Sequence, residues 1–132
     1  MIFVDTGVFI ALYREGDQYH EEAARLWPAA QPPLVTSNHV IDELATSLGR
    51  LAGFRYAADR VAALFAAAAV DVLRSTRADE LDALRWMRKY ADQRISFTDC
   101  VSFAMMRRYR IRTALTFDRH FKLAGFEVIG LK

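Results

Sequence analysis

The chain has 132 residues, with 18 Lys and Arg against 16 Asp and Glu, which gives a formal net charge of +2 when the histidines are neutral. This length is that of one domain, residues 1–132, which buries roughly two thirds of the surface of its unfolded chain. Hydrophobic residues make up 53% of the chain and charged residues 26%, so the composition excludes a disordered or fibrous protein.

Three features of the sequence indicate its compartment. The first residues lack the positive region of a signal peptide, and Asp5 interrupts their apolar run. The longest apolar run, 61–70, is only about half the length that a membrane-spanning helix needs. Cys100 is the single cysteine, so it forms no internal disulfide and fits a reducing cytoplasm as a small buried hydrophobe. We therefore expect a cytoplasmic protein with no membrane segment.

Short apolar or β-branched runs alternate with longer helical patterns along the chain. The predicted strands are 2–4, 34–36, 70–73, 112–116 and 127–129. The predicted helices are 8–13, 19–30, 39–51, 56–69, 78–91 and 99–109. Strands separated by helices in this way form a parallel sheet that is covered on both faces, so we expect an α/β fold with about five strands.

Acidic residues follow two of the predicted strands. Asp5 comes at the carboxyl end of the first strand, and Asp118 follows the fourth. In an open parallel sheet, ligands bind in the crevice beyond the strand ends, so these acids are candidate ligands. Each also has an ordinary structural interpretation. Asp5 would cap the next helix and stabilise it by about 1 kcal/mol, and Asp118 would begin a turn.

Two further acids lie on predicted helices. The apolar residues of the helix that follows the second strand share one face: Val40, Ile41, Leu44, Leu48 and Leu51. Helical periodicity places Glu43 on the flank of this face and Asp42 near the opposite side, so Glu43 is the better candidate for a site. Its alternative role is a partly exposed acid near the positive end of the helix dipole. Asp99 lies three residues after Ser96, which matches a capping box, and cap and ligand are equally supported.

Four acids at one end of a parallel sheet suit a hard divalent cation, because Mg²⁺ prefers carboxylate oxygens. The three histidines have no zinc-binding spacing: His20, His39 and His120. The sequence also contains no glycine-rich phosphate loop, so a nucleotide cofactor has no support.

The order and spacing of these motifs resemble the PIN-domain ribonucleases. The resemblance rests on Val-Asp-Thr-Gly at the start, Glu43 within Val-Ile-Asp-Glu-Leu, the pair Thr98-Asp99, and Leu-Thr-Phe-Asp-Arg-His-Phe after the fourth strand. It spans nearly the whole chain. Within the family, the chain looks most like the small VapC-type toxins of type II toxin–antitoxin modules.

The resemblance implies a Rossmann-like fold that hydrolyses RNA phosphodiester bonds with one or two Mg²⁺ or Mn²⁺ ions. Four acids match the catalytic metal ligands of the family: Asp5, Glu43, Asp99 and Asp118. Two hydroxyls match the positions beside them: Thr6 and Thr116. The resemblance also implies an antitoxin partner and a homodimer. One departure is Cys100, which follows Asp99 where many relatives carry Ala.

The residues after Asp118 are the candidate RNA-binding residues: Arg119, His120 and Lys122. Their cationic or polar side chains suit phosphate contacts, whereas the alternative is a solvated face. A non-catalytic module that binds metal or a partner stays open, and a DNA repair nuclease is a weaker alternative. A phosphatase of the haloacid dehalogenase type is excluded, because it needs a second acid where Gly7 stands.

Overall fold

The computed structural model describes residues 1–131, so Lys132 of the predicted domain lies outside the described residues. The strands are β1 (Ile2–Val4), β2 (Leu34–Ser37), β3 (Val70–Leu73), β4 (Thr113–Leu115) and β5 (Glu127–Ile129). The helices are α1 (Thr6–Tyr13), α2 (His20–Ala29), α3 (Asn38–Ala52), α4 (Phe54–Ala66), α5 (Arg77–Lys89), α6 (Phe97–Tyr109) and α7 (His120–Leu123), with a short 3-10 helix at Ala91–Gln93.

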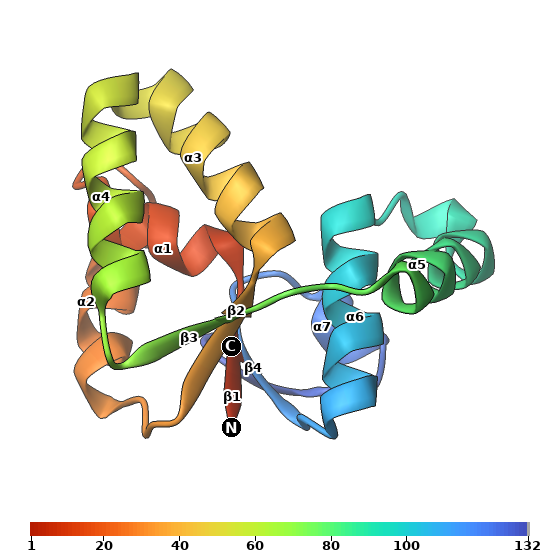
Figure 1. The fold of residues 1–132 in the computed structure, drawn as a ribbon. Coiled ribbons are helices and arrows are strands. Elements are labelled where there is room, and N and C mark those ends of the chain that lie inside the picture. The colour runs from red at the N-terminus through yellow and green to blue at the C-terminus, as the bar shows by residue number, and fades with distance from the viewer. Residues whose placement is uncertain (132) are drawn as a thin grey trace.

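The strands form one parallel sheet in the order β3-β2-β1-β4-β5. Figure 1 shows α1 to α4 on one side of the strands and α5 to α7 on the other. The chain therefore winds outward from β1 in one direction as far as β3 and then crosses to β4 on the other side of β1. The loops that follow β1 and β4 diverge at this switch point, which is where open α/β sheets bind their ligands.

The fold class is confirmed and a strand lies at each of the five predicted places, although β2 extends to Ser37 and β4 covers only Thr113–Leu115; further differences lie in the helices. Helix α1 begins at Thr6, two residues earlier than predicted, because Asp5 caps it. Helix α6 likewise begins at Phe97, behind the cap Ser96. The short helix α7 was not predicted, since four residues are too few to show a helical period. None of the helices described in residues 1–131 has the length and hydropathy to cross a membrane.

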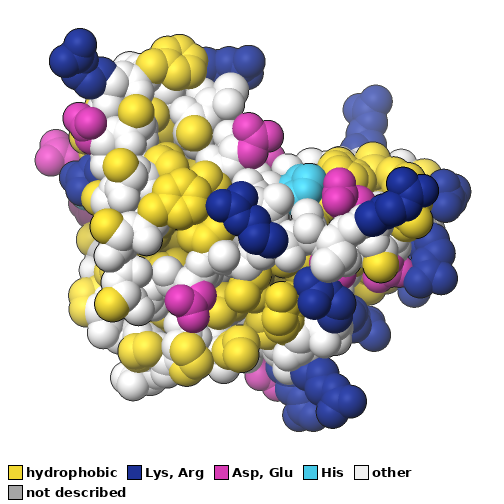
Figure 2. Space-filling model, viewed as in Figure 1, with side chains coloured by type: hydrophobic (Ala, Val, Ile, Leu, Met, Phe, Trp, Pro, Cys, Tyr) yellow, Lys and Arg dark blue, Asp and Glu magenta, His cyan; other side chains and the backbone are white. Residues whose placement is uncertain are grey.

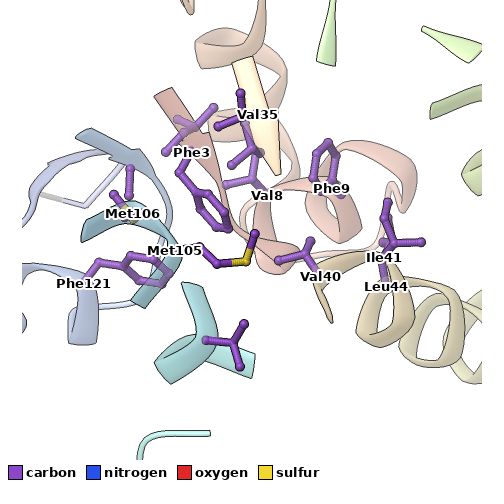
Figure 3. Close-up of a cluster of buried hydrophobic side chains, with 14 of the residues drawn as sticks. Phe3, Val8, Phe9, Val35, Val40, Ile41, Leu44, Met105, Met106 and Phe121 are labelled. Carbon is purple, nitrogen blue, oxygen red and sulfur yellow. The ribbon is translucent and has the colours of Figure 1, made fainter. Parts of the chain in front are cut away.

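The core lies between the sheet and both helical layers. Phe3 of the central strand contacts Phe121 of α7 in a stacked pair, with ring centroids 6.4 Å apart. Figure 3 shows Val8 and Phe9 of α1 on one side of this strand and Met105 and Met106 of α6 on the other. Cys100 is fully buried in the same core, as predicted, and burial raises the pKa of its thiol to about 11. The thiol is therefore neutral at physiological pH.

Helices α3 and α4 form a hairpin that extends beyond the sheet (Figure 1). Gly53 joins them with a φ of 102°, a conformation that suits glycine. Gly49 lets the two helices approach, because a Cβ at this position would lie 2.3 Å from the ring of Phe54. The prediction that Leu51 shares the buried face is wrong, since it is 52% exposed. This part of the hairpin extends beyond the sheet, so neither the sheet nor a helical layer covers Leu51.

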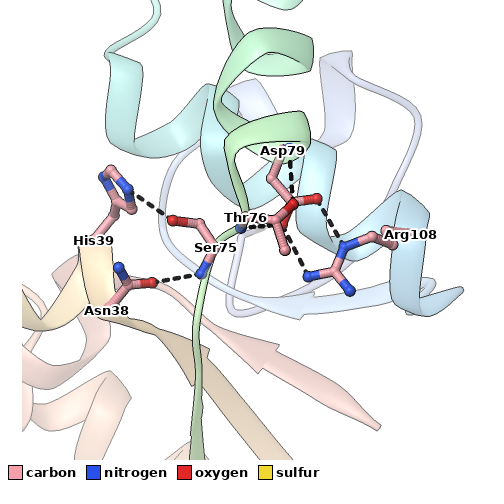
Figure 4. Close-up of polar contacts among 6 residues, drawn as sticks. All are labelled: Asn38, His39, Ser75, Thr76, Asp79 and Arg108. Carbon is pink, nitrogen blue, oxygen red and sulfur yellow. Dashed lines mark hydrogen bonds and ion pairs between the residues drawn. The ribbon is translucent and has the colours of Figure 1, made fainter.

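A polar network connects the beginnings of α3 and α5 to α6 (Figure 4). Asn38 accepts a hydrogen bond from the backbone N–H of Ser75 at 2.9 Å, and His39 contacts the Ser75 hydroxyl at 3.1 Å. One residue later, Thr76 and Asp79 form a complete capping box at the start of α5. Arg108 of α6 donates two hydrogen bonds to the Asp79 carboxylate, at 2.8 and 2.9 Å. The network therefore holds three helices in fixed relative positions.

Removing the carboxylate at the centre of this network destabilises the fold. Burial raises the pKa of Asp79, but the hydrogen bonds from Arg108 and Thr76 outweigh that effect and lower it. We expect Asp79→Ala to reduce the free energy of unfolding by about 1–3 kcal/mol, because the cap and the pair with Arg108 are both lost. The measurement is urea denaturation at pH 7.

The control is Asp82→Ala, which removes an exposed pair with Arg85 on the same helix. It should cost about 0.5 kcal/mol or less. The lowered pKa means that the contribution of Asp79 is present above its unfolded pKa and is lost as the pH falls through the folded value. The wild type and Asp79→Ala should therefore converge in stability in acid, and a difference that persists there would contradict this interpretation.

Candidate active site

A cavity of about 850 Å³ lies at the carboxyl ends of β1 and β4, and all four predicted acids line it. Two come from the loops that follow neighbouring strands, and two come from helices α3 and α6 on opposite faces of the sheet. Figure 2 shows the molecular surface hollowed between the α3–α4 hairpin and the α5–α6 side. The lining acids are Asp5, Asp17, Glu43, Asp99 and Asp118.

Asp5 is buried beneath the cavity, and both of its carboxylate oxygens accept hydrogen bonds. Oδ1 accepts from the backbone N–H of Thr6 at 2.8 Å, which caps α1. Oδ2 accepts from the hydroxyl of Thr116 at 2.8 Å. These two bonds fix the plane of the carboxylate, so Asp5 is held in a single orientation.

Thr116 connects Asp5 to Asp118, the acid that follows β4. Its hydroxyl donates to Asp5 and accepts a hydrogen bond from the backbone N–H of Asp118 at 2.9 Å. The Asp118 carboxylate in turn accepts from the backbone N–H of His120 at 2.8 Å, which closes a turn. The Nδ1 atom of His120 lies 3.1 Å from the same Oδ1. The predicted turn at Asp118 therefore exists, and its carboxylate also lines the cavity.

Asp99 lies in the first turn of α6, where the predicted capping box forms only in part. The Ser96 hydroxyl accepts a hydrogen bond from the backbone N–H of Asp99 at 3.1 Å. Within residues 1–131, the Asp99 carboxylate makes no return bond to the backbone of Ser96, in contrast to the complete box at the start of α5. The carboxylate is 7% exposed and lines the cavity. The cap therefore uses the backbone of Asp99 and leaves its side chain available as a ligand.

Helix α3 carries Glu43 to the cavity wall from the opposite layer. Its start is fixed by Ser37, whose hydroxyl accepts a hydrogen bond from the backbone N–H of Val40 at 3.2 Å. Glu43 is half-buried and lines the cavity, whereas Asp42 is exposed and does not line it. The helical phase read from the sequence therefore separates these adjacent acids correctly.

The crowding of these acids changes their ionisation. Burial raises the pKa of Asp5 to about 7, and the negative charges of Asp118 and Glu43 add to this effect. Burial likewise raises the pKa of Asp99 to about 9, with further contributions from the charges of Asp5 and Asp118. The ionisation of Asp5 and Asp99 therefore depends on burial and on the negative charges of the neighbouring acids. Strongly shifted acids in a cavity are typical of functional sites.

The donor set fits a divalent cation. Ligand atoms of Asp99, Asp118 and His120 lie within 4.8 Å of one another, a spacing that one ion can bridge. Carboxylate oxygens are hard ligands that suit Mg²⁺ and Mn²⁺, and a neutral imidazole nitrogen is a common metal ligand. The Thr6 hydroxyl is buried at the cavity without a hydrogen-bond partner in residues 1–131, so it is free to bond a water or a ligand there. His120 was predicted as a substrate contact, and its position makes it a candidate metal ligand as well.

The structure separates the predicted RNA-binding residues. Arg119 and His120 line the cavity, but Lys122 is exposed on α7 and does not line it. The arginines at the end of α6 also lie elsewhere. Arg108 pairs with Asp79, and Arg107 packs over the ring of Trp86 with its guanidinium carbon 5.3 Å from the centroid. Figure 2 shows Lys and Arg side chains gathered around this α5–α6 side of the molecule.

Sequence reasoning missed cavity residues that come from loops or their edges, among them Asp17, Tyr19, Arg94 and Phe117. Arg94 adopts a left-handed conformation with a φ of 55° at the end of the short 3-10 helix. Asp17 and Tyr19 precede α2, and no local pattern indicates that this loop reaches the cavity. Phe117 adjoins Asp118 in the sequence, which was the one signal that could have identified it.

Comparison with known proteins agrees with this geometry. The family model described as the PIN domain matches residues 2–127. Among curated proteins, the chain is 42% identical over 126 residues to the 23S rRNA-specific endonuclease VapC20 of Mycobacterium tuberculosis, covering 96% of this chain and 95% of the relative. It is 30% identical to ribonuclease VapC26 of the same species, covering 91% of this chain and 89% of the relative.

Solved structures show the same fold. The crystal structure of Mycobacterium tuberculosis VapC20, described as a Sarcin-Ricin loop cleaving toxin, superposes with a TM-score of 0.90 at 40% identity, covering 96% of both chains. A toxin–antitoxin complex from Klebsiella pneumoniae superposes with a TM-score of 0.70 at 13% identity, covering 98% of this chain and 96% of that one, which indicates a shared fold. The chain therefore belongs to the PIN-domain family, and its nearer relatives in this comparison are VapC-type toxins.

Proposed function

We propose that this protein is a metal-dependent endoribonuclease that hydrolyses RNA phosphodiester bonds as the toxin of a toxin–antitoxin pair. The observation that carries the proposal is the convergence of four acids on one cavity: Asp5, Glu43, Asp99 and Asp118. The names of the relatives, an rRNA-specific endonuclease and a ribonuclease, support RNA as the substrate. Ribosomal RNA is therefore the first substrate to test.

The acids act by binding and orienting Mg²⁺ or Mn²⁺. When bound, such an ion supplies Lewis-acid polarisation of the phosphate and neutralises charge that develops at its oxygens. Asp5 is held by the hydroxyl of Thr116 and the backbone of Thr6, so its lone pairs have fixed directions. His120 fixes Asp118 in the same way through its backbone N–H. A preset ligand geometry reduces the reorganisation that ion binding and the reaction require.

Cationic side chains at the cavity suit the RNA backbone. Arg119 and Arg94 are exposed residues that line it, so each guanidinium is able to contact a phosphate without leaving water. Such contacts bring the polyanion to a cavity whose own residues are acidic. A non-catalytic module would bind a metal or a partner without cleaving RNA, and the cleavage assays below distinguish the two functions.

The proposal includes an antitoxin and a second copy of the chain as partners. Exposed apolar side chains on the α3–α4 hairpin support a protein-binding surface there: Leu51, Phe54 and Phe65. The presence of toxin–antitoxin complexes among the structural neighbours is consistent with such a partner. An RNA substrate and a single reduced cysteine support a cytoplasmic location.

Asp99→Asn should lower the rate constant for RNA cleavage by about a thousandfold, the equivalent of several kcal/mol of transition-state stabilisation. An amide lacks the charge that a hard cation needs. The fold should persist, because Ser96 caps α6 through the backbone of residue 99. The assay is cleavage of purified 23S ribosomal RNA with Mg²⁺ or Mn²⁺, with a chelator as the blank. Asp71→Asn, an exposed acid on β3, is the matched control and should cleave like the wild type.

Glu43→Gln should remove most of the cleavage activity, whereas Asp42→Asn should retain it. The two residues are adjacent, yet only Glu43 lines the cavity. Both substitutions remove one negative charge from the same helix, so the pair controls for overall charge and for helix stability. The reverse result, an inactive Asp42→Asn beside an active Glu43→Gln, would refute the assignment of Glu43.

The melting temperature of the metal-free protein should fall as the pH rises from 5 to 9. The pKa of Asp5 is raised from 3.8 to about 7, and the pKa of Asp99 from 3.8 to about 9. The folded state therefore binds more protons than the unfolded state at pH values between the unfolded and the folded pKa of each acid. Deprotonation therefore favours unfolding as the pH rises through the folded pKa values. Added Mg²⁺ should reverse much of the loss at pH 8, because it binds the folded state alone.

Asp118→Asn tests the origin of this pH dependence, since the charge of Asp118 contributes to both raised pKa values. An amide oxygen is still able to accept the hydrogen bond from the backbone of His120. In chelator at pH 8, the variant should melt about 3 °C or more above the wild type, and Mg²⁺ should stabilise it less. A variant that melts at or below the wild-type temperature in chelator would show that the acids do not repel one another.

A further inference from the structure

An aromatic pair lies at the wall of the acidic cavity. Tyr19, the residue before α2, stacks on Phe117, which lies in the loop between β4 and α7. The ring centroids are 4.5 Å apart and the ring planes are inclined by 12°. Both residues line the same cavity as the four acids, and Phe117 is the immediate neighbour of Asp118. The pair is therefore adjacent to the proposed reaction centre.

The pair is held in position from both sides. The Asp17 carboxylate accepts a hydrogen bond from the backbone N–H of Tyr19 at 2.8 Å, and the carbonyl of Tyr19 accepts from the N–H of Ala23 at 2.9 Å. Phe117 packs against Gly130, where an added Cβ would lie 3.3 Å from the ring Cε1. Phe117 thus lies close to both Gly130 and Tyr19, and the loop before α2 is fixed to its helix.

The exposure of Tyr19 distinguishes it from the other stacked aromatic residues. One face of its ring is covered by Phe117, yet 41% of the residue remains exposed. Phe3, Phe9 and Phe103 also form aromatic pairs, but each is fully buried. A ring that is supported on one face by Phe117 and lines the cavity is able to present its other face to an occupant of the cavity. Unpaired nucleobases stack on such faces, and this contact tolerates any base.

We propose that Tyr19, supported by Phe117, is a stacking platform for an unpaired RNA base next to the phosphate that is cleaved. The proposal rests on the proposed function, because it needs RNA in the cavity. Gln18 and Arg119 line the cavity beside the pair and offer an amide and a guanidinium to the edge or the phosphate of the same nucleotide. The platform would favour RNA whose bases are already unpaired, such as loops and ends, since a base in a helix must first unstack.

Steady-state cleavage of a short RNA hairpin with an unpaired loop tests the proposal. Tyr19→Leu should raise KM about tenfold or more and change kcat less, because stacking contributes mainly to binding. Tyr19→Phe keeps the ring and should behave like the wild type. Phe117→Leu removes the support and should also raise KM. The control is Leu81→Ala, an exposed apolar residue of α5 that does not line the cavity. Melting temperatures establish that each variant is folded.

A second substrate separates stacking from a structural role. The base next to the cleaved bond is replaced by an abasic site, which should raise KM for the wild type about as much as Tyr19→Leu does. For Tyr19→Leu itself, the abasic site should add little, because the base has already lost its partner. Equal additional losses in both proteins, or a Tyr19→Leu variant that cleaves with the wild-type KM, would overturn the proposal.

A binding assay distinguishes failure of this inference from failure of the proposed function. The probe is the same hairpin with 2-aminopurine at the loop position, bound to the Asp99→Asn variant in Mg²⁺, with and without Tyr19→Leu. Fluorescence quenching that requires Tyr19 supports the platform even if the wild type cleaves no RNA. Cleavage by the wild type with quenching that is independent of Tyr19 refutes the platform alone. Absence of both cleavage and binding refutes both.

Discussion

The geometry of the cavity depends on one buried hydroxyl, that of Thr116. It donates to Asp5 and accepts from the backbone of Asp118, so a side chain at the end of β4 fixes the acid that follows β1 and the acid that follows its own strand. The two strands are neighbours at the switch point, where the loops diverge and leave a crevice. Thr116 is fully buried at the end of β4. The register between β1 and β4 therefore sets the separation of the Asp5 and Asp118 carboxylates.

Holding several acids close together opposes folding, and the chain offers no buried cation within residues 1–131 to offset it. The arginines that line the cavity are exposed, and Asp118 contacts the imidazole of His120 there at 3.1 Å. Proton uptake by Asp5 and Asp99 relieves the repulsion when metal is absent. A divalent cation relieves it without protonation, so ion binding and the stability of the site are linked.

The sequence was sufficient for the parts of the site that depend on regular structure. Asp5 and Asp118 were located by the rule that acids at neighbouring strand ends converge, and Glu43 was separated from Asp42 by helical phase. Tyr19 and Arg94 were missed because they lie on loops whose course depends on tertiary packing. Lys122 was placed near Asp118 by sequence distance alone, but the turn of α7 leaves it outside the cavity. Local patterns therefore predicted the cavity residues at strand ends and on helices better than those on loops.

For Asp5, Asp99 and Asp118, the sequence posed a choice between a local cap or turn and binding a ligand, and the structure shows that the local hydrogen bonds form while all three residues line the cavity. A carboxylate has about four acceptor sites, and a cap uses one of them. The cap formed by Asp5 and the turn formed by Asp118 each engage one oxygen with a backbone N–H. At Asp99 the cap engages the backbone N–H and does not involve the carboxylate. Each local bond fixes a side-chain or backbone torsion, so the caps orient the remaining lone pairs of the carboxylates. A residue that begins a helix thereby has its free lone pairs set in directions that suit an ion.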